Sequence, residues 1–134
     1  MVAKDHVLRG VQESIAQLGH GKHAPLARLQ PDDWLVYYSP RQSYPNGDAL
    51  RAFTAIGRVA ANEIYEVETS AGFHMSRRKV EYLPAHDAPI APLLPFLSFS
   101  RDTTNWGMVM RRGLVSITDE DLSLITEAMG VEVR

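Results

Sequence analysis

The sequence contains no cysteine among its 134 residues. Disulfide bonds and thiolate metal sites are therefore excluded, and the composition fits the reducing cytoplasm. The chain also has no basic-then-apolar signal segment at its start and no apolar run long enough to span a membrane. These absences predict a soluble, cytoplasmic protein that does not associate with membranes.

Neither sign of charge dominates, because 14 Lys and Arg residues stand against 16 Asp and Glu residues, giving a formal net charge of -2. Binding nucleic acid through counterion release alone needs an extended basic surface, and this composition argues against one. Two local basic clusters remain. These clusters contain four candidates for contact with a nucleic-acid backbone: Arg77, Arg78, Arg111 and Arg112. Strand alternation allows only half of each cluster to face one way.

Signatures of catalysis are also missing. No glycine-rich phosphate loop follows a predicted strand, and no nucleophile elbow or acid pair with helical spacing is present. His20 and His23 have no third ligand nearby in the sequence, so zinc is not expected. The length predicts one domain over residues 1–134. We expect this domain to be a monomer and to use no cofactor. A small hydrolase or nucleic-acid-processing enzyme is the alternative to simple binding, and a protein-interaction module acting through the proline-rich residues 88–97 is another.

The run over residues 33–40 is rich in β-branched and aromatic residues and is bounded by proline, which predicts a central strand. Alternation places two sets of side chains on opposite faces: Trp34, Val36 and Tyr38 on one, and Leu35, Tyr37 and Ser39 on the other. Both faces are mostly apolar. We therefore expect a strand buried on both sides, with Trp34 and Phe53 in the core.

Apolar spacing of three and four predicts a helix from Asp5, its N-cap, to Leu18, with Gly19 as C-cap. Further strands are predicted over residues 52–59, 60–69, 73–83 and 108–117, and Gly57 is expected to mark a bulge or a close backbone contact. Thr118 is the predicted N-cap of a last helix that ends at Gly130. The pattern predicts an α+β fold: a small mixed β-barrel of five or six strands with flanking helices.

Several segments resemble, in order and spacing, the EVE domains of the PUA-like superfold. The matching segments lie at residues 5–11, 20–22, 24–26, 33–40, 53–57, 88–90, 97–99, 101–102, 106–107 and 111–114. This resemblance covers nearly the whole chain. It implies kinship with the YTH readers of methylated adenine in RNA, and a pocket that holds a modified base of DNA or RNA. Family members usually begin with an aromatic strand before the first helix, so either the true start lies upstream or that strand is shortened here.

The candidate nucleobase-binding residues are His20, Lys22, Tyr38, Ser39, Arg101, Asp102 and Trp106. The resemblance implies roles for the loop at His20 and Lys22 and for the Arg101-Asp102 pair. Trp106 stands out because a tryptophan in a polar loop is not an obvious core residue. Each candidate also has a purely structural explanation. His20 and Lys22 would lie in a solvated loop, Tyr38 in the core and Ser39 in a turn. Arg101 and Asp102 would form an ion pair, and Trp106 would cap the barrel end.

We therefore expect a non-catalytic reader of a modified nucleobase. Its site is expected where Trp106 and the loop at residues 20–22 meet beside Tyr38, Ser39 and Asp102.

Overall fold

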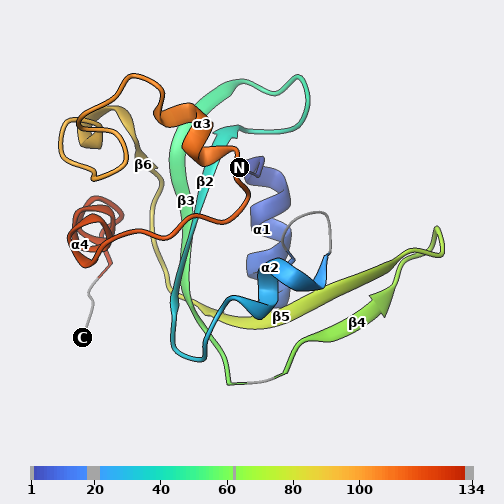
Figure 1. Ribbon diagram of the computed structural model, residues 1–134. Coiled ribbons are helices and arrows are strands. Elements are labelled where there is room, and N and C mark those ends of the chain that lie inside the picture. Colours follow the sequence, from blue (N-terminus) through green and yellow to red (C-terminus); the bar gives the residue numbers. More distant parts are fainter. Residues whose placement is uncertain (1, 18–21, 62, 132–134) are drawn as a thin grey trace.

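The computed structural model describes residues 2–17, 22–61 and 63–131. An antiparallel sheet of six strands forms its centre, and helices flank it (Figure 1). The helices are α1 (Lys4–Glu13), α2 (His23–Ala27), η2 (Ala91–Leu93), α3 (Trp106–Met110) and α4 (Asp119–Ala128). The strands are β1 (Ile15–Ala16), β2 (Trp34–Arg41), β3 (Ala49–Val59), β4 (Tyr65–Glu68), β5 (His74–Tyr82) and β6 (Ala88–Pro89).

The strand order is β1-β5-β3-β2, with β4 added on β5 and β6 added on β3. This arrangement confirms the predicted α+β class. The predicted closed barrel is not confirmed, because the described strands form an open sheet. None of the helices in the described ranges is both long and apolar enough to cross a membrane.

Strand β2 is buried on both faces, as its two apolar rows predict. Leu35 and Tyr37 belong to a first core cluster, which includes Leu26 of α2 and Val7 of α1. Tyr38 belongs to a second cluster, against which Trp34 and Val36 pack. Figure 1 shows the corresponding layers, with α1 and α2 on one side of β2 and β3 and with α4 on the other.

A bulge in β3 breaks the regular pairing with β2. Tyr37 pairs with Ala55 but Tyr38 pairs with Phe53, so Thr54 is the extra residue. Its hydroxyl lies 2.7 Å from the hydroxyl of Ser39, and both residues are buried. The bulge therefore gives two interior hydroxyl groups a mutual hydrogen bond.

Gly57 lies where β3 and β5 approach closely. A close contact is one of the two roles that the sequence predicts for this glycine. A Cβ atom at this position would lie 2.7 Å from the carbonyl oxygen of Glu81 and 3.0 Å from the Cα of Tyr82. Both contacts are with backbone, which cannot swing aside. A side chain at Gly57 would therefore force the two strands apart.

The first helix is shorter than predicted. It ends at Glu13 because Ser14 adopts a left-handed conformation with φ 56°, and Ile15–Ala16 then pair with Lys79 and Arg78 of β5. The N-cap is Ala3 instead of Asp5, which lies in the first turn. Ile15 would fit the apolar stripe of a longer helix as well as it fits a strand, but here it is buried as part of the sheet.

The strand predicted over residues 108–117 is wrong. The chain forms helix α3 over Trp106–Met110 instead, and Gly113 then turns the chain with φ 83°. Trp106 and Met110 are four residues apart, the spacing of one helical face, and both pack against the second core cluster. This tertiary contact outweighs the strand propensity of the segment.

Thr118 is the N-cap of helix α4, as predicted. The Thr118 hydroxyl accepts a hydrogen bond from the Asp121 amide at 3.1 Å, and the Asp121 carboxylate accepts one from the Thr118 amide at 3.2 Å. The same carboxylate accepts from the amide of Ser98 at 2.8 Å and from its hydroxyl. Asp121 thus caps α4 and ties it to the segment before α3.

We expect Asp121 to make folding stability depend on pH. Burial opposes ionisation of Asp121, but the hydrogen bonds from Ser98 and Thr118 outweigh burial and hold its pKa below the usual value. A depressed pKa in the folded state stabilises the protein above the unfolded-state pKa of about 3.9, and this contribution disappears as the pH falls through the folded-state pKa.

Asp121→Asn should therefore cost roughly 2 kcal/mol of unfolding free energy at pH 7 and progressively less below pH 4. Urea titrations of both proteins from pH 7 to pH 3 measure this difference. The variant Asp119→Asn is the control, because Asp119 is an exposed acid in the same first turn. A stability difference for Asp121→Asn that stays constant with pH would contradict the assignment.

Candidate functional site

Tyr38 and Trp106 meet, as predicted. Their ring centroids lie 6.1 Å apart with an interplanar angle of 86°, and the Tyr38 ring lies 5.8 Å from that of Phe53. Tyr38 is 7% exposed and Trp106 is half-buried. Burial raises the pKa of the Tyr38 hydroxyl, and the charge of nearby Arg51 partly opposes this increase. The aromatic contact thus belongs to the second core cluster and lies edge to face.

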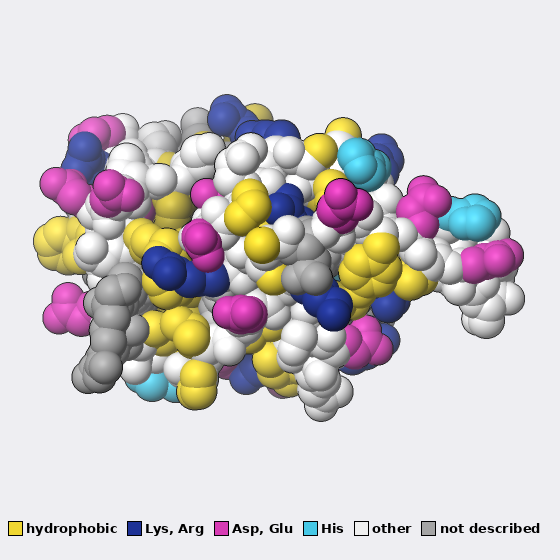
Figure 2. All heavy atoms as spheres, turned by 90° about the horizontal axis from the view of Figure 1, so that it is seen from below, with side chains coloured by type: hydrophobic (Ala, Val, Ile, Leu, Met, Phe, Trp, Pro, Cys, Tyr) yellow, Lys and Arg dark blue, Asp and Glu magenta, His cyan; other side chains and the backbone are white. Residues whose placement is uncertain are grey.

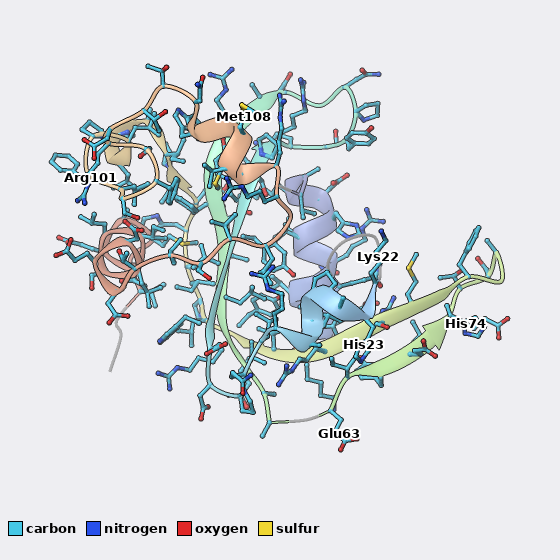
Figure 3. All side chains as sticks on the ribbon, in the orientation of Figure 1. Lys22, His23, Glu63, His74, Arg101 and Met108 are labelled. Atoms are coloured by element: carbon cyan, nitrogen blue, oxygen red, sulfur yellow. The ribbon has the colours of Figure 1, made fainter. Side chains whose placement is uncertain are left out.

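The other predicted base contacts do not gather around this pair. The Ser39 hydroxyl is fully buried beside Thr54. Arg101 and Asp102 are exposed, with 3.7 Å between Nε and Oδ2. Figure 3 shows Lys22 and Arg101 on opposite sides of the sheet. His20 lies outside the described residues. The predicted convergence is therefore correct for Tyr38 with Trp106 and wrong for Lys22 with the Arg101 loop.

The arginines of β5 face opposite ways. Arg78 is buried, and its Nη1 donates to the carbonyl oxygens of Leu26, at 3.2 Å, and Leu29. Arg77 points to the other side, where its Nε donates to Gln17 Oε1 at 3.1 Å. Arg78 therefore holds α2 in place and is not accessible to a phosphate. Arg77 is half-buried, and Arg111 and Arg112 are exposed after α3.

Charges of both signs are mixed on one face of the molecule (Figure 2). Figure 2 shows this face, on which blue and magenta side chains alternate among hydrophobic ones. Lys4 pairs with Asp87 at 2.5 Å, and Arg77 Nη1 lies 3.8 Å from Glu13 Oε2. The face in view carries no extended basic surface, in agreement with the expectation from the net charge.

A cleft of about 190 Å³ lies between α1 and the strands β1 and β5. Its deeper part contains the rings of Tyr37 and Tyr82, whose centroids are 6.4 Å apart. Its exposed rim carries ionisable side chains of both signs: His6, Arg9, Glu13 and Arg77. The cleft therefore combines an aromatic floor with hydrogen-bonding groups at its opening.

Both tyrosines of the cleft are neutral at physiological pH. Burial raises the pKa of Tyr37 to about 12, although a hydrogen bond with Tyr82 partly opposes the increase. Burial and the neighbouring Tyr37 also raise the pKa of Tyr82, whose hydroxyl donates to the carbonyl oxygen of Ile15 at 2.8 Å. Both hydroxyls therefore stay protonated, and that of Tyr82 is engaged with the backbone.

Of the cleft residues, the sequence predicted only Arg77 as a functional candidate. A local signal existed for part of the rim, because His6, Arg9 and Glu13 follow one face of α1 at spacings of three and four. No local signal links that face to Arg77, which is 60 positions away from its partner Gln17 in the chain. The cleft depends on the pairing of β1 with β5.

A sequence model of the EVE domain matches residues 2–128. The chain belongs to the EVE domain family. Related proteins include the UPF0310 protein in the gntR 5' region of Bacillus licheniformis, which is 43% identical over 127 residues, 95% of this chain and 86% of that one. A UPF0310 protein of Mycolicibacterium gilvum is 44% identical over 98% of this chain and 94% of its own. Membership of the EVE family, which is PUA-like, indicates nucleic-acid binding.

Proposed function

We propose that this EVE domain is a non-catalytic reader that holds a modified base of DNA or RNA in the cleft between α1 and β5. One observation carries the proposal: the cleft places the aromatic rings of Tyr37 and Tyr82 beneath a rim that includes Arg77. An aromatic floor accepts the face of a base, and the rim supplies hydrogen bonds to its edge and to the adjoining phosphate.

The size of the cleft favours one base. Its volume of about 190 Å³ is below the range of about 300–1,000 Å³ found for pockets that take drug-sized ligands. A second hollow runs along α4 and is lined by Leu122, Ser123, Thr126, Glu127 and Val131. It contains no aromatic side chain, so the cleft at α1 is the better candidate for a base.

The chemistry of the cleft supports binding without conversion. The raised pKa values of Tyr37 and Tyr82 keep both hydroxyls protonated. The Glu13 carboxylate lies 3.8 Å from the Arg77 guanidinium, so it is paired with a cation at the rim. Incubation with modified oligonucleotides, followed by mass spectrometry, should return them unchanged. Recovery of a cleaved or demodified product would instead support the enzymatic alternative.

We expect Arg77→Gln to weaken binding of a modified oligonucleotide by about ten-fold, the effect of losing one charge-assisted hydrogen bond. Fluorescence anisotropy compares oligonucleotides that carry N6-methyladenine or 5-methylcytosine with plain ones of the same sequence. The preference for the modified base should fall, because Arg77 lies at the cleft.

The matched control is Lys79→Gln, which removes one positive charge from the same strand outside the cleft lining. It should leave the preference for the modified base unchanged. Equal losses in the two variants, on modified and plain oligonucleotides alike, would show that Arg77 contributes only general electrostatic attraction.

A further inference from the structure

The loop between β2 and β3 exposes an aromatic ring that the cleft does not use. Tyr44 is 85% exposed. The loop around Tyr44 belongs to the end of the molecule where α3 also lies (Figure 1). A tyrosine ring this exposed buries little surface in the fold and leaves its aromatic face open to a partner.

The loop that carries Tyr44 is held by its own backbone. The Gln42 amide donates to the Asp48 carbonyl oxygen at 2.9 Å, and the Gly47 amide donates to that of Ser43 at 2.9 Å. A Cβ atom on Gly47 would lie 2.4 Å from the Ser43 amide nitrogen, so the turn closes only around glycine. An ordered loop presents the ring without a large entropy cost on binding.

Two arginines flank this loop at the ends of its strands. Arg41 and Arg51 are both exposed, and in the described part of the chain neither forms an ion pair. Arg51 has a left-handed backbone, with φ 50°, and its carbonyl oxygen accepts a hydrogen bond from the Ile90 amide at 2.9 Å.

The adjacent helix α3 extends the same surface. Met108 is 66% exposed on this helix, and Figure 3 shows it at the end of the molecule that carries the β2–β3 loop. Arg111 and Arg112 follow α3 and are also exposed without an ion pair in the described ranges. Four exposed arginines without an ion pair in the described ranges thus lie in or beside the β2–β3 loop and after α3, and the exposed acids Asp48 and Asp5 also lie in and beside that loop.

We propose that Tyr44, Arg41 and Arg51, here called the Tyr44 surface, bind a single-stranded segment of nucleic acid. The Tyr44 ring stacks on an unpaired base, and the arginines contact phosphates. A duplex keeps its bases stacked on each other and offers no free face to the ring, so the partner is single-stranded. The inference rests on the proposed function only in taking nucleic acid as the partner.

Plain single-stranded 12-mers of DNA and RNA test the ring by anisotropy, with a duplex of the same sequence for comparison. Tyr44→Ala should weaken single-strand binding by about ten-fold, whereas Tyr44→Phe, which keeps the ring, should bind like the wild type. Neither variant should lower the melting temperature, since the side chain is exposed. Phe73→Ala is the matched control, because Phe73 is an exposed aromatic residue, 65% exposed, beside the β4–β5 turn.

A salt titration tests the arginines. For single strands the slope of log K against log salt is about -0.7 for each neutralised phosphate. The double variant Arg41→Gln/Arg51→Gln should therefore make the slope shallower by about 1.4. The control Arg28→Gln/Lys79→Gln removes two exposed charges elsewhere, which form no ion pair within residues 2–17, 22–61 and 63–131, and it should leave the slope unchanged.

The outcomes separate this inference from the proposed function. Tyr44→Ala should weaken binding to plain and modified strands equally and leave the preference for the modified base unchanged. This result supports the Tyr44 surface whether or not the cleft reads a modification. Equal binding by wild type and Tyr44→Ala overturns it, even if the modification preference holds. Tighter binding to duplex than to single strands, or binding to an acidic peptide but to no oligonucleotide, also overturns it.

Discussion

Replacement of Arg78 by methionine is expected to lower the free energy of unfolding by about 3 kcal/mol. Arg78 is 7% exposed, and its Nη1 donates to the carbonyl oxygens of Leu26 and Leu29 at the end of α2. Methionine fills a similar volume but donates no hydrogen bond, so both carbonyl groups lose their donor in a buried setting. The loss is measured by urea unfolding at pH 7.

The matched control is Lys79→Met, at the next position of β5, where the side chain is exposed. Its effect should stay within about 0.5 kcal/mol. Arg78→Lys keeps the charge and part of the donor capacity, so we expect an intermediate loss and a folded protein even if the methionine variant does not fold. Equal stability of the Arg78→Met and Lys79→Met variants would show that Arg78 does not hold α2.

Local features were predictable from the sequence because nearby residues determine them. The alternating faces of β2 follow from strand geometry, and the start of α4 follows from Thr118 and the acids after it. The α+β class follows from the order of such elements. Closure into a barrel depends on the pairing of distant strands, and the structure shows an open sheet instead.

The errors lie where tertiary contacts decide between two local options. Residue 15 fits an extension of α1 as well as a strand, and pairing with Lys79 of β5 selects the strand. Residues 108–110 have strand propensity, but packing of Trp106 and Met110 against the second core cluster selects a helix. Neither partner is adjacent in the sequence. Periodicity alone therefore could not settle these segments.

The candidate site was predicted less completely than the fold. The contact of Tyr38 with Trp106 was correct, but Lys22 and Arg101 lie on opposite sides of the sheet. Tyr37 was assigned to a buried face, and the structure shows that the same buried ring also lines the cleft. The cleft draws on α1, β1, β2 and β5, so a pattern within any one segment does not reveal it.

We expect Trp106→Ala to lower the free energy of unfolding by about 2–3 kcal/mol and the melting temperature by roughly 10 °C. Removal of a fully buried tryptophan costs about 3–5 kcal/mol, and Trp106 is half-buried against the second core cluster. Its edge-to-face contact with Tyr38 is lost as well. The preference of the folded fraction for a modified base should remain unchanged, because the cleft lies on the other side of the sheet.

Thermal unfolding and anisotropy on the same variant separate the packing role of Trp106 from a role as the aromatic wall of a base pocket. Trp106→Phe keeps a ring and should lose less stability, and Met108→Ala, an exposed change in the same helix, should lose little. A ten-fold loss of affinity for a modified oligonucleotide, with an unchanged melting temperature, would place the base at Trp106. The cleft between α1 and β5 would then no longer be the candidate site, because one domain would hold the same base only once.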